Sequence, residues 1–427
     1  MKKLTAAALL CFWSFTATGD DRVTVPSPAE KQLALARTAI RENPKIYGNH
    51  NALGLALTRR ARETSNAEYY TQALEALEQS FLLEPDNFAG RRIEVWTLLG
   101  RHEFARALEK AEILNRRAPD DILTYALLTD AYVELGKYDQ AERAVQWMLD
   151  LRPGNVAALT RGAYLRELFG DVEGAAEWMT EAYQRTRLDE VEDRAWLLTQ
   201  VAHLQLGAGR MDEAEASLNR ALELFPDYHY ALANLAKVRA ARGEHAEAAE
   251  LLRRHCELAP HPENFFYLGQ ALLRAGRVEE AQAVFAKFEA GARREMDNND
   301  NANRELVFYY LENSRRPTEA LAIARAEIER RRDVFTLDAL AWALHANGQL
   351  VAAQEAIEHA LQPGIQDARL LYHAGVIALD RNDEDEARRY LNRSLEVNPA
   401  SFVAESARQA LGSFPSNNKP AAIPSAE

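Results

Sequence analysis

The sequence predicts an all-α solenoid in which about ten helix hairpins stack along one superhelix. Prolines at 85, 119 and 153, and again at 226 and 260, lie 34 residues apart, a period typical of repeat arrays. Each period holds two stretches with apolar residues at 3- and 4-residue spacings, which indicates two amphipathic helices. Alanine also recurs at one fixed place in the period, where two helices must pack closely.

The segment 122–155 shows the repeating unit. Its apolar or small positions are Tyr125, Leu128, Tyr132, Leu135, Ala141, Val145 and Met148. Gly136 supplies the turn between the two expected helices, and Pro153 ends the second one. One such hairpin has too little core to fold alone, so neighbouring hairpins must share their apolar faces.

The period also sets the domain organisation. Residues 1–19 form a leader, 20–44 a linker with a helix near 28–43, 45–401 the array, 402–412 a capping helix and 413–427 a disordered tail. The expected repeats are 47–87, 88–121, 122–155, 156–194, 195–228, 229–261, 262–300, 301–333, 334–367 and 368–401. Extra residues near 62–67 and 188–194 read as short insertions between helices. Each repeat is expected to contact only its neighbours.

The leader is expected to direct export. Lys2 and Lys3 precede an apolar run of 12 residues, and the small residues Ala17 and Gly19 offer a cleavage site before Asp20. The run is shorter than the roughly 20 residues of a spanning helix, so we predict a cleaved signal peptide, a periplasmic or secreted protein and no membrane span in the mature chain. A retained membrane anchor is the alternative.

The net charge limits the kinds of partner that the chain can bind, and its cysteine content limits the disulfides that it can form. The net charge of −13 becomes −15 after cleavage, which disfavours nucleic acid and anionic membranes as partners. Cleavage leaves Cys256 as the single cysteine, so the array must be stable without an internal disulfide. We expect Cys256 to be a buried apolar residue.

No catalytic, cofactor-binding or metal-binding residues are predicted. The chain has no phosphate-binding loop, nucleophile elbow or H-E-x-x-H helix. Asp297–Asn301 resembles the start of a calcium loop, but Ala302 and Phe308 stand where Gly and Glu are required. His255, Cys256 and His261 are close in sequence, yet their expected places on a helix and in the following turn should keep them apart. We predict no enzyme and no cofactor.

The repeat resembles the tetratricopeptide repeat. The unit 122–155 matches that pattern, with Thr129 and Val145 where the family has Gly and Phe. Small residues stand at the eighth position, at Gly54, Ala163, Ala202, Ala236, Gly269, Ala341 and Gly375. The twentieth position is Ala107, Ala141, Ala175, Ala214, Ala248, Ala281, Ala320, Ala353 and Ala387. The resemblance implies a right-handed superhelix whose first helices line a concave groove.

The resemblance also implies which side chains would meet a ligand in that groove. The expected groove residues are Arg92, Trp96, Asp130, Tyr164, Trp196, His203, Tyr230, Lys237, Phe266, Tyr309, Trp342 and Tyr372. Thr160, Gln270, Glu305, Phe335, Asp338 and Arg369 occupy the same strip. Aromatic side chains dominate interaction hot spots, so this strip suits an extended chain. In a tightly wound superhelix, some of these aromatics would instead pack on neighbouring hairpins.

Together these features predict a non-catalytic scaffold or adaptor of the bacterial envelope that binds a peptide or a partner protein in its groove. One alternative is a solenoid that binds polysaccharide, or assists its export, by stacking sugar rings on Trp96, Trp196 and Trp342. Another is an enzyme with helical repeats, such as a glycosyltransferase or peptidase, but such an enzyme would need a further domain.

Overall fold

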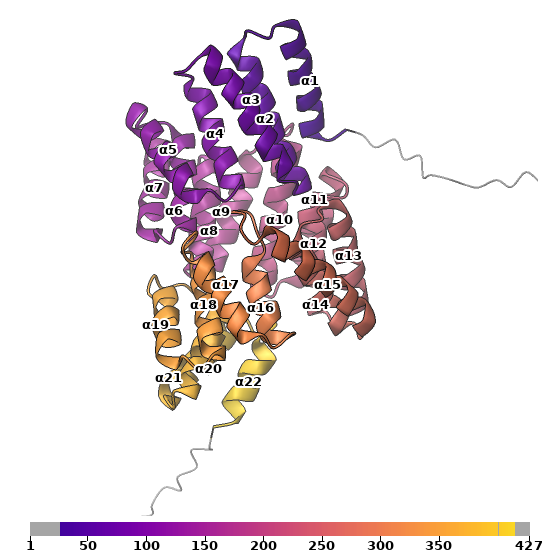
Figure 1. Cartoon of the computed structure of the whole chain (residues 1–427), viewed down its shortest axis with the longest axis vertical. Helices are drawn as coiled ribbons and strands as arrows, with labels where there is room; N and C mark the ends of the chain where they lie inside the picture. The colour runs from indigo at the N-terminus through magenta and orange to yellow at the C-terminus, as the bar shows by residue number, and fades with distance from the viewer. Residues whose placement is uncertain (1–25, 400, 415–427) are drawn as a thin grey trace, which may run out of the picture.

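The structure is a computed structural model that describes residues 26–399 and 401–414. Within these residues it has 22 α-helices and no strand. The predicted signal peptide, residues 1–19, lies outside the described residues, as does 415–427 of the predicted tail. Figure 1 shows the helices in chain order, from α1 at one end of the long axis to α22 at the other.

The first half of the chain forms α1 (Pro28–Glu42), α2 (Tyr47–Thr64), α3 (Glu68–Leu83), α4 (Phe88–Gly100), α5 (Phe104–Arg117), α6 (Ile122–Glu134), α7 (Tyr138–Leu151), α8 (Val156–Leu168), α9 (Val172–Arg185), α10 (Val191–Gly207) and α11 (Met211–Leu224). The second half forms α12 (His229–Ala241), α13 (His245–Leu258), α14 (Pro262–Arg274), α15 (Val278–Glu295), α16 (Asn303–Glu312), α17 (Pro317–Glu327), α18 (Val334–Ala346), α19 (Leu350–Leu361), α20 (Ala368–Asp380), α21 (Glu384–Val397) and α22 (Ala404–Gly412).

Ten helix hairpins, from α2/α3 to α20/α21, follow one another between α1 and α22 in the described residues. The predicted all-α solenoid of about ten hairpins is confirmed. The nine alanines at the twentieth position are each at most 1% exposed, because the first and second helices of a hairpin cross there. At the eighth position, a Cβ on Gly269 would lie 2.5 Å from the Phe285 ring, so only a glycine allows this approach.

The placement of the two sequence insertions between helices suggested loops. In the structure, each insertion instead contributes residues to a helix. The extra residues near 62–67 extend α2 to Thr64, and those near 188–194 belong in part to an α10 of 17 residues. At the other end of the chain, Phe414 belongs to the packed body although the tail was expected to begin at 413. It is 8% exposed, and the guanidinium of Arg388 lies 4.0 Å from its ring centroid.

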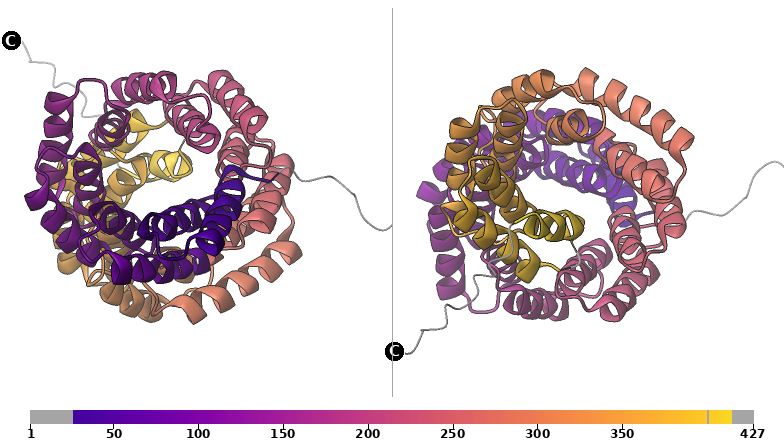
Figure 2. Two further views of the ribbon diagram at one scale, coloured as in Figure 1. Left: turned by 90° about the horizontal axis from the view of Figure 1, so that it is seen from above. Right: turned by 90° about the horizontal axis from the view of Figure 1, so that it is seen from below.

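The array winds into a ring around its long axis and continues past one full circuit (Figure 2). Hairpins α2–α9, called the upper turn here, then meet segments from α10 onward that are far away in sequence. Tyr138 Oη accepts a hydrogen bond from the Val334 amide at 3.0 Å, and the Leu168 carbonyl accepts one from the Gln366 amide at 2.8 Å. We call this line of contacts the seam. It shows that the expectation of contacts between neighbouring repeats alone is wrong.

The seam repeats with the period of the array. The contacts of Tyr138 and Leu168 join residues 196 and 198 positions apart, about six repeats. Beside the contact of Tyr138, the turn glycine Gly136, at φ +70°, approaches the Arg332 carbonyl so closely that a Cβ would lie 2.5 Å from its oxygen. Each of these hairpin turns of the upper turn therefore lies on a linker between later repeats, and the two circuits stack in register.

Candidate functional site

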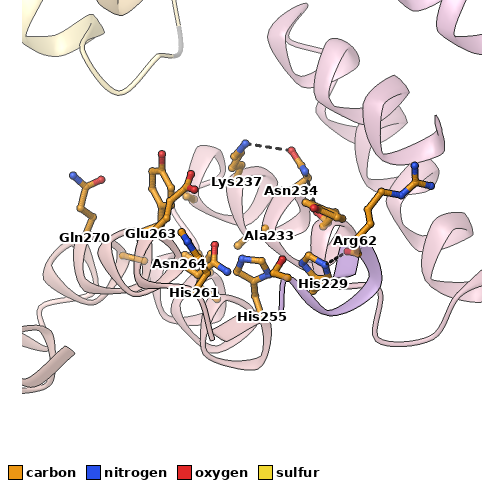
Figure 3. A pocket seen from close by; sticks show the side chains of 18 of the residues that line it. Arg62, His229, Ala233, Asn234, Lys237, His255, His261, Glu263, Asn264 and Gln270 are labelled. Atoms are coloured by element: carbon orange, nitrogen blue, oxygen red, sulfur yellow. Dashed lines mark hydrogen bonds between the residues drawn. The ribbon is translucent and has the colours of Figure 1, made fainter. Parts of the chain in front are cut away.

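A cavity of about 490 Å³ lies inside the ring, where the upper turn meets α12 and α14. The upper turn contributes Arg62, Ser65, Ala67, Tyr70 and His102, with Ala61 and Gly100. The opposite wall comes mainly from the inner faces of α12 and α14, with residues of α13 behind them; Figure 3 shows Asn234, Lys237, Glu263 and Gln270 on this side. The cavity is thus a composite of segments that are far apart in the sequence, and it exists only because the ring closes.

Five of the ten histidines of the chain line this cavity: His102, His229, His245, His255 and His261. His229 and His255 are 1% and 5% exposed, and their rings stack with centroids 5.4 Å apart. Burial lowers the pKa of His229 to about 4, with a smaller contribution from His255, and burial also lowers the pKa of His255. Both rings are therefore neutral near pH 7.

The tautomer of His229 follows from its partner. Its Nε2 lies 3.2 Å from the Arg62 carbonyl oxygen, which can only accept, so Nε2 carries the proton and donates. Nδ1 of His229 is then an acceptor, and it has no hydrogen-bond partner among the described residues. Nδ1 of His245 and of His255 and Nε2 of His261 also lack a hydrogen-bond partner there, although the last lies 3.6 Å from Asp300.

Two ionisable side chains in the cavity, Glu263 and Lys237, have pKa values that are shifted away from their usual ranges. Burial, reinforced by the nearby carboxylate of Glu305, raises the pKa of Glu263 to about 7. Burial lowers the pKa of Lys237, whose Nζ donates to Asn234 Oδ1 at 3.3 Å. In the part of the chain that the structure describes, neither Lys237 nor Glu263 has an ion-pair partner within 4 Å. Burial therefore disfavours the charged form of each of these two side chains.

Arg62 closes the cavity at the seam. Its guanidinium pairs with Glu192 and Asp193 at the start of α10, and the Nε to Glu192 Oε1 distance is 3.1 Å. Glu192 also accepts a hydrogen bond of 2.6 Å from the hydroxyl of Tyr228, which is fully buried. Both ends of this contact come from the two sequence insertions, so the departures from the 34-residue period build the rim of the cavity.

Of the expected groove residues, the structure brings two into this cavity, Tyr230 and Lys237, together with Gln270 from the same strip. Asp130 and Tyr164 line a smaller hollow of about 220 Å³ with His102, and Tyr164 is 39% exposed. Two polar residues instead tie neighbouring repeats together: Arg92 pairs with Asp121 at 2.8 Å and His203 with Glu167 at 2.7 Å.

The remaining expected groove residues pack against protein. Phe266 must be removed from the ligand-facing set, because it is 3% exposed and lies 5.4 Å from the Phe288 ring within the core. Trp96, Trp196 and Tyr309 pack on the core clusters of their repeats. Trp342 stacks on His345 and His373 at 4.8 and 4.1 Å, and Tyr372 lies 6.3 Å from Trp342.

Sequence reasoning missed most of the cavity wall. His255 and His261, expected to stay apart, line the same space, together with Asn234, Asn264 and Tyr267. One signal was available in the sequence at His102, which stands 34 residues before the turn glycine Gly136. It adopts φ +58°, a conformation that few residues other than glycine accept.

No group of three or more His, Cys, Asp or Glu in the described residues could hold a metal ion. Cys256 is 4% exposed, and burial raises the pKa of its thiol to about 12, so it is unreactive. None of the helices in residues 26–399 and 401–414 combines the length and the apolar character that crossing a membrane requires. The fold and this cavity define the class of protein as a helical repeat solenoid with an interior cavity.

Comparison with known protein families finds one kind of repeat in the chain. Sequence profiles of the tetratricopeptide repeat match residues 127–190, 201–263 and 368–401. In these three stretches the chain carries tetratricopeptide repeats. No curated protein sequence matches it.

Several solved structures are similar to the chain. One is a thermophilic tetratricopeptide repeat protein of Thermus thermophilus, with 22% identity, coverage of 44% of this chain and 99% of that one, and a TM-score of 0.38. A second is PilW, a type IV pilus biogenesis factor, with 15% identity, coverage of 48% and 93%, and a TM-score of 0.41. A third is the human IFIT1 dimer with PPP-AAAA, with 12% identity, coverage of 87% and 95%, and a TM-score of 0.48.

Proposed function

We propose that this protein is a non-catalytic scaffold of the bacterial envelope that holds an extended segment of a partner protein inside its ring. Tetratricopeptide repeat proteins generally mediate protein–protein interactions and are usually scaffolds without catalytic activity. The observation that carries the finer proposal is the composite cavity between the upper turn and helices α12 and α14. Its volume of about 490 Å³ suits a few residues of an extended chain.

The inner wall offers what a peptide backbone needs. Gln270 has a carboxamide with no hydrogen-bond partner among the described residues, and Asn234 uses its amide nitrogen on the Tyr230 carbonyl at 2.9 Å. Carboxamides both donate and accept, so they can pair with the N–H and C=O groups of an extended segment. Tyr267 is 41% exposed on the inside of the ring, and it adds aromatic surface at low entropy cost.

The location in the envelope rests on the predicted signal peptide at residues 1–19. The net charge of −13 suits a partner that is neither nucleic acid nor anionic membrane.

The structure favours a protein segment over a polysaccharide. A sugar-binding groove needs open aromatic faces, and Trp96, Trp196 and Trp342 were the candidates for them. The first two pack on core clusters, and the ring of Trp342 is engaged by two imidazoles. These contacts leave the polysaccharide alternative without its expected platform.

Photo-crosslinking in cells of the source bacterium tests the proposal. A benzophenone amino acid at Tyr267 is expected to trap a protein partner in the envelope fraction. The control is Leu188, which is 82% exposed in the segment between α9 and α10. Equal capture from both positions, or none from Tyr267, would contradict binding inside the ring, and recovery of the protein in the cytosol would contradict the envelope location.

A further inference from the structure

We propose that the partner segment in this cavity lies along α14 and carries two opposite charges, a basic and an acidic side chain about five residues apart. This inference rests on the proposed function and adds the chemistry of the partner. Three observations carry it: the face of α14 that lines the cavity, the charged side chains there that have no ion-pair partner, and the order of those charges along the helix.

One face of α14 lines the cavity along its whole length. Glu263, Tyr267, Gln270 and Arg274 follow one another at spacings of four, three and four residues, which places them on one side of the helix. Figure 3 shows Glu263 and Gln270 on this side. At a rise of about 1.5 Å per residue, Glu263 and Arg274 lie about 16 Å apart along the helix axis. An extended chain rises about 3.3 Å per residue, so about five residues of a ligand span this face.

Three charged side chains of the lining have no ion-pair partner among the described residues: Glu263, Lys237 and Arg274. Arg274 is exposed, and it has no hydrogen-bond partner in those residues either. The other two charged residues of the lining differ from them. Arg62 is already paired, and a carboxylate oxygen of Asp300 lies 3.5 and 3.6 Å from ring nitrogens of two histidines. The wall therefore offers a ligand one free carboxyl group and two free cations.

These free charges are ordered along the wall. Glu263 stands in the first turn of α14, on the side of the seam, and Arg274 is the last residue of that helix. Lys237 has the same place on α12 that Gln270 has on α14, the ninth position of its repeat. Gln270 stands about one helical turn before Arg274, so both cations lie toward the end of the wall away from the seam. The wall is thus acidic at one end and basic at the other.

A segment with a single sign of charge fits only one end of this wall. An acidic segment would pair with Lys237 and Arg274, but it would be repelled at Glu263, and a basic segment would meet the reverse. Burial raises the pKa of Glu263 and lowers that of Lys237, so an opposite charge from the ligand offsets part of what desolvation costs each group. A segment with one charge of each sign pairs with both ends, while Asn234 and Gln270 hold its backbone between them.

Calorimetric titration with blocked peptides of equal length tests the inference. Two dipolar peptides carry Lys and Glu about five positions apart in a Gly–Ser background, one in each order along the chain. Three controls carry the Lys alone, the Glu alone or neither. The better dipolar peptide is expected to bind about tenfold more tightly than each control. If a control binds as tightly, the inference is overturned while the proposed function stands, and if no peptide binds, the proposed function itself is contradicted.

Charge exchange locates the binding. Arg274→Glu is expected to weaken the dipolar peptide about tenfold and to prefer a peptide in which Lys replaces its Glu. The side chain of Arg274 is exposed and has no hydrogen bond to lose among the described residues, so circular dichroism is expected to show an unchanged fold. Glu263→Gln is expected to reduce the dipolar peptide to the affinity of the peptide that carries Glu alone.

Arg37→Glu is the matched control, because Arg37 is an exposed residue of α1 outside the cavity and the exchange changes the net charge equally. It is expected to leave the affinities for all of these peptides unchanged. If Arg274→Glu keeps the preference of the native chain, or if Arg37→Glu loses that preference to the same extent, the peptide does not lie along α14 and the inference is overturned.

Discussion

Arginine–carboxylate pairs occur both on the outer surface of the ring and at the seam, but they differ in burial and in how far apart in the sequence their partners lie. On the outer side, Arg253 of α13 and Arg277, the residue just before α15, exchange ion pairs with Glu250 and Glu280, and the acidic side chains are about half exposed. At the seam, Arg62 pairs with Glu192, whose side chain is 11% exposed and which also holds the buried Tyr228 hydroxyl. The outer pairs join neighbouring repeats, whereas the seam pair joins residues 130 positions apart.

This difference shows where arginine–carboxylate pairs determine shape. An exposed pair is screened by water and contributes about 0–1 kcal/mol, so the outer pairs adjust an array that packing already holds. Removing one partner of a buried pair leaves the other without compensation and costs about 3–5 kcal/mol. The seam pair therefore contributes more to ring closure than an outer pair contributes to the array, while the alanines of the hairpins let their helices pack closely.

The largest effect is expected from Glu192→Ala. The change leaves Arg62 with Asp193 alone and takes the acceptor from Tyr228, so we expect a loss of about 3–5 kcal/mol of stability with helical content retained. Chemical unfolding followed by circular dichroism measures it. Glu250→Ala on the outer surface is the matched control, with an expected loss below about 1 kcal/mol. Equal losses would remove the distinction between seam and surface.

Acidification is expected to act next, through His229. Its folded pKa is about 4 against 6.5 unfolded, so the unfolded chain binds more protons between these values. This imidazole therefore removes up to about 3 kcal/mol of stability as the pH falls from about 6.5 to about 4. Glu263 has a pKa of about 7 in the folded chain against 4.5 in the unfolded chain, so it binds its proton more readily when folded. It therefore adds stability as the pH falls from about 7 to about 4.5.

Variants separate the two titrations. His229→Phe is expected to lose less stability than the native chain on acidification, and Glu263→Gln to lose more. Unfolding midpoints above and below the window measure both. Identical pH dependence in all three chains would show that neither group is desolvated as the closed ring requires.

A smaller effect is expected within one hairpin. Ala141 is fully buried where α6 and α7 cross, and Ala141→Phe should overpack this contact at a cost of about 1–3 kcal/mol. Ala246→Phe, at an exposed position of α13, should leave the unfolding midpoint unchanged. An unchanged midpoint for Ala141→Phe would contradict the repeat register.

The hairpins could be predicted because their rules are local. A glycine turn, a small residue at the eighth position and an alanine at the twentieth specify one hairpin and its contact with the next, and Gly269 and Ala141 pack as those rules require. Ring closure is different, since it depends on small rotations summed over several repeats, about four of them between Arg62 and Glu192. No residue pattern within one repeat records that sum, so the meeting of Arg62 with Glu192 could not be derived.

The site was predictable only in part for the same reason. Position within a repeat identified Tyr230 and Lys237, which face inward whether or not the ring closes. It could not tell that Phe266 turns into the core or that His102 reaches the cavity from another circuit. The useful signals were departures from the period: the two insertions and the histidine in a glycine position all lie at the rim.

The closed ring is tested most directly by a distance across the seam. Spin labels at Lys137 and Arg332, two exposed positions beside the contact of Tyr138 with Val334, report it by pulsed electron resonance. Cys11→Ser keeps labelling specific, since the thiol of Cys256 is buried. The account predicts a short, narrow distance distribution that broadens and lengthens in Glu192→Ala. A long, broad distribution in the native chain would show that the ring is open and that the cavity is not assembled.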